Sequence, residues 1–314
     1  MEPFRIGLIG GGRMGQTHLR ALAPSHDVVV TSVVEPNPET AATLRAMGLR
    51  VHETVPDLLT VGGIDGVLIA APTDRHLGLV EQVAQAGLPI LCEKPCGLTA
   101  AQARAAGEAA RRHAVVLQVA YWRRFIPALQ DLRARITSGG MGAVLMTVCA
   151  QWDQAPPPAQ FRSHSGGIFI DMGVHEIDQL RWLTGCEVTD VSASAYPPLE
   201  DPDAVGDADS AQALLTMSDG SAALVSLGRF HPDGDMVAAE MFGSRDHVRV
   251  AVLDATDGEG PQLAALLRQA EAFARYARGG AQEGAGIDDA ETALVVADRL
   301  STAANLQLLG SEQS

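Results

Sequence analysis

Three residues that could do chemistry recur at helical spacing within Gly166–Asp178. Residues three and four positions apart share one face of a helix, so Asp171, His175 and Asp178 are expected to project together. A carboxylate one turn from an imidazole is a general acid–base arrangement, because the acid orients the ring and stabilises its protonated form. The same spacing also suits a solvated polar stripe on a surface helix, so the rest of the chain must decide between the two.

A glycine-rich turn near the N-terminus offers a place for a nucleotide. Gly10-Gly11-Gly12-Arg13-Met14-Gly15 fits the pattern G-x-G-x-x-G, follows an apolar run and opens a helical stretch. In this pattern Gly10 permits the tight turn, Gly12 lets the backbone approach a pyrophosphate, and Gly15 allows close packing of helix and strand. The free N–H groups at the start of the helix would then face the phosphates.

Glu35 bears on whether a dinucleotide binds, and on which one. It ends the second predicted strand, twenty residues after Gly15, where a carboxylate can bind both ribose hydroxyls. The alternative is a glycine-rich turn with an ordinary surface glutamate, but the strand context and Glu35 together favour a dinucleotide. A 2′-phosphate would face this carboxylate, and Pro36-Asn37-Pro38 offers no cation to compensate it. NAD is therefore favoured over NADP, with Arg13 as a reservation because a loop arginine can reach a 2′-phosphate.

Two polar segments follow predicted strands of the same domain. Ala70–His76 follows the fourth strand, and Glu93-Lys94-Pro95 follows the fifth. Ligands of an open parallel sheet bind at the carboxyl ends of its strands, so Lys94 can hold a substrate hydroxyl and favour its developing negative charge. On these two residues alone, a surface lysine paired with Glu93 is the preferred interpretation. The residues expected to contact the cofactor are Gly10, Gly12, Arg13, Met14, Gly15, Glu35, Ala71, Pro72, Thr73, His76, Glu93 and Lys94.

The alternation of strand and helix patterns up to about Val119 indicates the fold of the N-terminal part. Continuous apolar strands with crossover helices describe a parallel sheet covered on both faces. Residues 1–120 are therefore predicted to form a doubly wound α/β Rossmann domain.

The pattern changes after Tyr121. Long segments of alternating polarity follow, the last of them Val237–Ala251, and Asp219-Gly220 between two of them is a hairpin signal. This alternation suits an antiparallel sheet with one face buried and the other available for something else. Residues 121–314 are predicted to form a domain for substrate binding and oligomerisation, and its last helix, about 288–308, is a candidate to pack back on the Rossmann domain.

Composition excludes several classes of protein. The formal charge of −15 over 314 residues argues against nucleic acid or an anionic membrane as partner. No run approaches the roughly 18 apolar residues of a membrane-spanning helix. The N-terminus enters a strand at once, which leaves no room for a signal peptide, so a cytoplasmic location is expected. The four cysteines lack metal-ligand spacing, so we expect buried free thiols and no metal.

These segments together resemble the glucose–fructose oxidoreductase / inositol dehydrogenase / rhizopine-catabolism (Gfo/Idh/MocA) family. The shared segments are Gly10–Gly15, Ala71–His76, Glu93-Lys94-Pro95, Arg123-Arg124-Phe125 and Gly166–Asp178. The resemblance covers nearly the whole chain and is greatest to the bacterial inositol dehydrogenases. It implies a pyridine-nucleotide oxidoreductase of sugars or cyclitols, with a Rossmann domain followed by an open, mostly antiparallel sheet. It also implies a homodimer or homotetramer joined through the open sheet faces.

The resemblance assigns roles by motif position. It places Lys94, Asp171 and His175 in the catalytic group, and makes Asp178 and Arg123 substrate-contacting candidates. The most specific marks are the Glu-Lys-Pro segment and the Gly-Gly-x-x-x-Asp-x-x-x-His-x-x-Asp helix.

The surroundings of the expected substrate site depart from the family pattern. Many relatives have Asp where this chain has Ile126, and Trp122 stands where a smaller or more polar residue is common. The substrate therefore cannot be copied from any one relative. His164, in an individual loop before the catalytic helix, either contacts substrate or caps the helix region. His231 lies where relatives bring a strand-end loop toward the pocket, which makes it a further substrate-binding candidate.

The expected activity is NAD-dependent oxidation of a secondary hydroxyl of a cyclitol or sugar to a ketone or lactone. In this scheme His175 removes the hydroxyl proton, Asp171 orients His175, and Lys94 supports the developing alkoxide. Two alternatives stay open. One is a redox-neutral sugar-modifying enzyme with tightly bound NAD, and the other is a nucleotide-bound sensor or regulatory protein. The intact catalytic set argues against the sensor.

Overall fold

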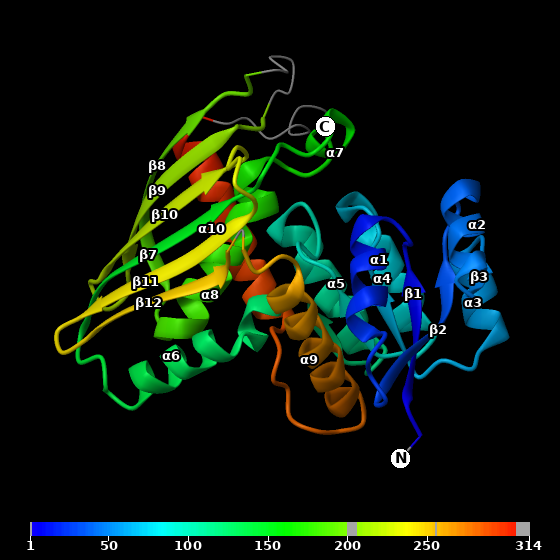
Figure 1. Ribbon diagram of the computed structural model, residues 1–314. Helices are drawn as coiled ribbons and strands as arrows, with labels where there is room; N and C mark the ends of the chain where they lie inside the picture. The colour runs from blue at the N-terminus through cyan, green and yellow to red at the C-terminus, as the bar shows by residue number, and fades with distance from the viewer. Residues whose placement is uncertain (1, 200–205, 255, 306–314) are drawn as a thin grey trace. The chain divides into compact units, whose positions relative to one another are not determined.

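The computed structural model describes residues 2–199, 206–254 and 256–305. It contains two six-stranded sheets, each accompanied by helices (Figure 1). None of the helices in these ranges combines the length and the apolar character that crossing a bilayer requires.

The chain divides into two compact units. The first contains the chain up to Trp122 together with Gln262–Glu291, and the second contains Arg123–Pro261 and the chain from Thr292 onward. The last helix, α10 (Ile287–Ala303), contains one of these boundaries, and positions 306–308 of the predicted helix lie outside the described residues.

The first sheet has the strand order β3-β2-β1-β4-β5-β6, with parallel pairing throughout. Its strands are β1 (Phe4–Ile9), β2 (Val28–Val34), β3 (Arg50–His52), β4 (Gly66–Ile69), β5 (Ile90–Cys92) and β6 (Leu117–Val119). The unit's helices are α1 (Arg13–Leu22), α2 (Pro38–Ala46), α3 (Val55–Val61), α4 (His76–Gln85), α5 (Ala100–Arg112) and α9 (Gly260–Ala277). The predicted doubly wound Rossmann arrangement is confirmed.

The core of the first unit explains why α9 groups with it. β4 is buried at every residue, as expected for a central parallel strand. Phe273 of α9 is fully buried in the same apolar cluster as Leu8 and Leu68, and its ring meets Phe4 edge-on at 5.8 Å between centroids. Burying one side chain of this size stabilises a fold by about 1.5–3 kcal/mol, which ties α9 to this sheet.

The second sheet has the order β12-β11-β7-β10-β9-β8. Its strands are β7 (Val144–Trp152), β8 (Val188–Tyr196), β9 (Ser210–Met217), β10 (Ala222–Gly228), β11 (Met236–Gly243) and β12 (His247–Leu253). All pairings are antiparallel except that of β7 with β10, which is parallel. The predicted mostly antiparallel sheet is thus confirmed, and the Asp219-Gly220 turn joins β9 to β10 as a hairpin with Gly220 at φ +86°.

One strand prediction needs correction. Val237–Ala251, treated as a single alternating segment, is a hairpin of β11 and β12. The chain reverses after Gly243, where an added Cβ would overlap the carbonyl oxygen of Met141. The alternation carries through both strands, so polarity alone did not reveal the turn.

The two faces of the second sheet differ. α6 (Pro127–Thr137) and α8 (Val174–Thr184) pack together and against β12 and β7 respectively (Figure 1). Residues of β9 alternate between buried and exposed, with Leu214 52% exposed directly across from Leu224 of β10. Among the described residues of this unit, the face away from the helices is therefore uncovered at these positions.

Candidate active site

The turn between β1 and α1 requires glycine at two positions for different reasons. Gly10 has φ +99°, and a Cβ there would lie 2.6 Å from the carbonyl oxygen of Ala70. A Cβ on Gly15 would overlap the carbonyl oxygen of Gly10, which is backbone and cannot yield. A Cβ on Gly12 would meet nothing within 4 Å, so the turn is open at the position where a pyrophosphate is expected. This geometry fits a dinucleotide.

Glu35 is fixed beside this turn. Its side chain is buried, one oxygen accepts a hydrogen bond from the N–H of Gly11 at 2.8 Å, and the other accepts from the N–H of Asn37 at 2.8 Å. Carboxylate oxygens keep further lone pairs, so both can still accept hydrogen bonds from ribose hydroxyls. The carboxylate is thus oriented before any ligand arrives. Of the other cofactor candidates, Arg13 and Pro72 are exposed and Met14, Ala71 and Thr73 are half-buried.

His76 joins the two segments that follow β4 and β5. The ring is almost fully buried, and its two nitrogens lie 2.8 Å from the carbonyl oxygens of Pro95 and Ala71. Burial lowers the pKa of His76, and the two carbonyl contacts only partly oppose this. A neutral ring donates to one of the two carbonyls at a time. His76 therefore holds the strand-end segments to each other, and its predicted contact with the cofactor stays a prediction.

Glu93 has partners other than the neighbouring lysine's ammonium. One of its oxygens lies 2.6 Å from Nε2 of the fully buried His18 on α1, and the other accepts from the backbone N–H of Lys94 at 3.1 Å. Glu93 thus anchors its segment to α1, while Lys94 is half-buried. A pairing of the Lys94 ammonium with Glu93 stays a prediction.

In the second unit, Asp171 lies in a π-helical turn, Phe169–Gly173, immediately before α8. Its backbone N–H donates to the carbonyl of Gly167 at 2.9 Å. Gly167 has φ +87°, and a Cβ there would overlap the carbonyl oxygen of Gly206, so the glycines before the helix are required by the backbone path. The predicted helix is present from Val174, but its first turn is wider than expected. Such π turns are frequent at functional sites.

Asp171 and His175 occupy the shielded start of this helix. The Asp171 side chain is 13% exposed, and His175 is 7% exposed. One turn of helix separates them, as the spacing predicts. A shielded carboxylate beside an imidazole can perform proton transfer, because water competes less for either group.

The two predicted substrate-contacting residues of this unit are buried in ion pairs. Arg124 binds both oxygens of Asp178, at 2.5 and 3.0 Å. Arg123 is 2.5 Å from Glu176 and also donates to Gln151 at 2.6 Å. Asp178 and Arg123 are only 2% and 3% exposed, so a substrate role for either stays a prediction.

The two remaining histidine candidates make local contacts. His164 is exposed, with Nδ1 2.8 Å from the hydroxyl of Ser163 and 3.0 Å from the carbonyl of Gln160. His231 donates its backbone N–H to the carbonyl of Asp153, and its Nδ1 lies 2.6 Å from the carbonyl of Gly234. These contacts fix the loop conformations and leave the predicted substrate roles untested.

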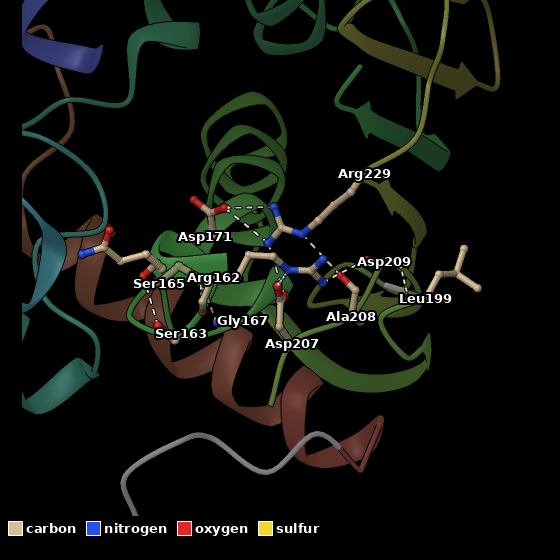
Figure 2. A network of polar contacts seen from close by, with 11 residues as sticks. Arg162, Ser163, Ser165, Gly167, Asp171, Leu199, Asp207, Ala208, Asp209 and Arg229 are labelled. Carbon is tan, nitrogen blue, oxygen red and sulfur yellow. Dashed lines mark hydrogen bonds and ion pairs between the residues drawn. The ribbon is translucent and has the colours of Figure 1, made fainter. Parts of the chain in front are cut away.

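Sequence reasoning missed the partner of Asp171. Figure 2 shows the guanidinium of Arg229, which follows β10, lying against the Asp171 carboxylate. Its two terminal nitrogens are 3.4 and 3.5 Å from Asp171 Oδ2, and Nη2 is also 3.2 Å from Asp207. Arg162 in turn contacts Asp207 at 2.6 Å and Asp209 at 2.9 Å. Burial would lower the pKa of Arg229, but the charges of Asp171 and Asp207 raise it overall, so Arg229 stays charged.

Asp153, directly after β7, was also missed. Burial raises the pKa of its carboxyl, a hydrogen bond from Gln151 opposes this, and the nearby Asp171 charge raises the pKa further. Asp153 and Arg229 end neighbouring strands because β7 and β10 run parallel, with Trp152 opposite Gly228. A polar residue directly after each strand is the available signal, but it is informative only once the parallel pairing is known.

The described ranges contain no group of three or more His, Cys, Asp or Glu residues arranged to hold a metal ion. A carboxylate and an imidazole, the groups of Asp171 and His175, are side chains that can transfer protons.

The chain resembles known proteins over nearly its whole length. Residues 4–121 match the domain described as "Oxidoreductase family, NAD-binding Rossmann fold", and residues 129–249 match the GFO/IDH/MocA C-terminal domain. The rhizopine catabolism protein MocA of Rhizobium meliloti is 46% identical to the chain, covering 95% of it and 94% of that protein. The myo-inositol dehydrogenase Hyg17 of Streptomyces leeuwenhoekii is 34% identical, covering 88% and 89%. The crystal structure of a myo-inositol dehydrogenase from Corynebacterium glutamicum superposes with a TM-score of 0.86 at 25% identity, covering 96% and 97%.

The glycine turn yields a paired prediction. Gly15→Ala should lower the stability of the nucleotide-free protein by about 1–3 kcal/mol, because the added methyl overlaps backbone. Gly12→Ala should leave that stability within about 0.5 kcal/mol of the parent, because the methyl meets no protein atom. It should nevertheless weaken NAD binding at least roughly tenfold, by about 1.4 kcal/mol. Urea unfolding and calorimetric titration with NAD measure both effects. Unchanged NAD affinity in Gly12→Ala would mean that the pyrophosphate does not approach this turn.

Proposed function

Because the chain belongs to the Gfo/Idh/MocA family of NAD-binding oxidoreductases, we propose that it oxidises a secondary hydroxyl of a cyclitol of the inositol type to a ketone. A ring or anomeric hydroxyl of a sugar belongs to the same substrate class and would give a ketone or a lactone. The observation that carries the proposal is the shielded Asp171 one turn before His175, because this pair can take a proton from an alcohol. The relatives named above support the choice of cyclitols as substrates.

In the proposed mechanism His175 removes the proton of the hydroxyl. The Asp171 carboxylate orients the imidazole and stabilises the imidazolium that forms. Lys94 is the third member of the group, and its ammonium supports negative charge on the substrate oxygen as the proton leaves. The glycine turn and Glu35 would hold the pyrophosphate and ribose of NAD, and bound NAD would supply the hydride acceptor that the oxidation needs.

A panel of inositols, aldoses and amino-sugars, assayed with NAD and NADP, tests the reaction. We expect steady NADH formation with at least one cyclitol, and a kcat/KM for NAD on the order of a hundredfold above that for NADP. The preference is expected because a 2′-phosphate would face the Glu35 carboxylate. Comparable kcat/KM with the two nucleotides would contradict this, and Arg13→Ala would then show whether Arg13 binds the phosphate. Substrate turnover without net NADH would favour the redox-neutral alternative, and NAD binding without turnover would favour a sensor.

The division of roles predicts distinct kinetic effects. His175→Ala should lower kcat by about 10²–10⁴ while leaving NAD affinity nearly unchanged. Asp171→Asn should also lower kcat, because the imidazolium loses its stabilising charge. Lys94→Ala should lower kcat and raise the KM for the substrate. The kcat/KM of the parent should rise through a group titrating near neutrality, and His175→Ala should lose this limb.

His113→Ala is the matched control for these kinetics, since His113 is an exposed histidine at the end of α5. It should behave like the parent. Near-parental kcat in His175→Ala, or survival of the neutral limb, would move the base to Lys94.

The uncovered face of the second sheet supports a proposal about assembly. Leu214, Leu224 and Val148 lie side by side across β9, β10 and β7. Charged residues lie on the next two strands of the sheet, where Glu240 of β11 is in register with Arg249 of β12. An apolar patch of this kind favours burial against a second copy of the same face. We therefore propose a homodimer or homotetramer joined through this face.

Light scattering tests the assembly. The parent should be a dimer or tetramer at micromolar concentration, and Leu224→Glu should shift it toward the monomer by placing a charge inside the interface. Met47→Glu is the matched control, because Met47 is an exposed apolar residue (60%) of the other unit, on the segment after α2. A stable monomer for the parent would contradict the proposal.

A further inference from the structure

We propose that Arg229 is a positioning residue for Asp171, which it holds ionised and correctly oriented through a buried chain of alternating charges. This charge chain consists of Asp171, Arg229, Asp207, Arg162 and Asp209 (Figure 2). The inference rests on the proposed function, because it concerns how the Asp171–His175 pair is set up for proton transfer. It adds a residue that follows β10, far from the helix motif in sequence.

The burial of Arg229 is the first step of the argument. Its side chain is 0% exposed, and its guanidinium is surrounded by Asp171, Asp207 and the carbonyl oxygen of Ala208, the last at 3.3 Å. A buried guanidinium without such partners would be strongly unfavourable, so its position is dictated by the negative groups around it. The backbone reinforces this, because Arg229 donates its N–H to the carbonyl of Asp209 at 2.9 Å.

The distances differ along the charge chain. Arg162 contacts Asp207 and Asp209 at 2.6 and 2.9 Å, whereas Arg229 contacts Asp207 at 3.2 Å and Asp171 only at 3.4 and 3.5 Å. The ion pairs at the Arg162 end of the charge chain are therefore the shorter ones. Contacts of 3.4–3.5 Å are long for hydrogen bonds, so Arg229 acts on Asp171 mainly through charge. Asp171 is also the most exposed member of the charge chain, since 13% of its side chain is accessible. It can therefore meet a reacting group.

Charged groups near Asp171 come from several elements. Arg229 follows β10, Asp153 follows β7, Asp207 precedes β9, and His175 lies on α8. The negative charges of Asp153 and Asp207 oppose the ionisation of Asp171. Burial is the main cause of the raised pKa of Asp153, and the charge of Asp171 raises this pKa further. Arg229 offsets both carboxylates. Removing its charge should make Asp171 harder to ionise and should also stabilise a protonated His175.

A less ionised Asp171 and a more easily protonated His175 both lower activity at acidic pH. Arg229→Gln should shift the acid limb of kcat/KM to higher pH by about one unit or more. At pH values below the midpoint of the limb, kcat/KM should fall roughly tenfold. At high pH, on the plateau, most of the activity should be regained. Arg229→Lys keeps the positive charge, so its limb should stay within a few tenths of a unit of the parent.

Arg162→Gln is the matched control, because it removes a buried arginine of the same charge chain whose ion pairs are with Asp207 and Asp209. It should lower stability, and its acid limb should move less than half as far as that of Arg229→Gln. If Arg229→Gln does not fold, Asp207→Asn gives an independent test. With the competing carboxylate neutralised, Arg229 acts more fully on Asp171 and the limb should move to lower pH.

A readout without turnover separates this inference from the proposed function. The His175 ring can be titrated by NMR with ¹³C-labelled histidine, its signal being identified by loss in His175→Gln. Arg229→Gln should raise the midpoint of this titration, whichever substrate the enzyme uses. An unshifted ring titration, or a uniform loss of activity at every pH in Arg229→Gln, would overturn the positioning role. Near-parental kcat in His175→Ala would instead contradict the role of His175 as the base in the proposed mechanism.

Discussion

A buried positive charge has to be surrounded by negative groups, and the second unit satisfies this constraint at Arg229. An isolated ion in a protein interior is unfavourable by several kcal/mol, even after the surroundings relax. Asp171 in the π turn and Asp207 before β9 must therefore converge on the end of β10. The close passage of Gly167 against the carbonyl of Gly206 allows this convergence, because a side chain at that position would separate the two segments.

In the first unit, buried histidines hold the segments that follow the strands. His18 fixes Glu93, and His76 links the segment after β4 to the segment after β5. Strand-end segments are otherwise the most mobile parts of a doubly wound fold. Buried polar contacts hold them where the sheet binds its ligands, so Lys94 lies on a segment anchored on either side, at Glu93 and at Pro95.

Sequence patterns predicted the features that depend on local order. Apolar runs located the strands of the first sheet other than the short β3. The glycine spacing located the turn after β1, and periodicity located α8. They could not reveal the partners of buried charges. Arg123 and Asp178 were predicted to meet substrate, yet each is paired with a residue about fifty positions away. Arg229 and Asp153 become neighbours only through the parallel pairing of β7 and β10, which alternating polarity does not specify.

The ion pairs of α8 fix the part of the helix that carries His175. Glu176 and Asp178 are held by the consecutive arginines Arg123 and Arg124, and Asp171 is held by Arg229 in the turn before the helix. A helix fixed at three acidic positions can neither rotate nor slide without breaking a buried pair, which typically costs about 3–5 kcal/mol. His175 lies between these positions, so the backbone that carries its ring is held in place by the same pairs. Such preorganisation suits the proposed role of His175 as the base, since a displaced base forfeits much of its rate advantage.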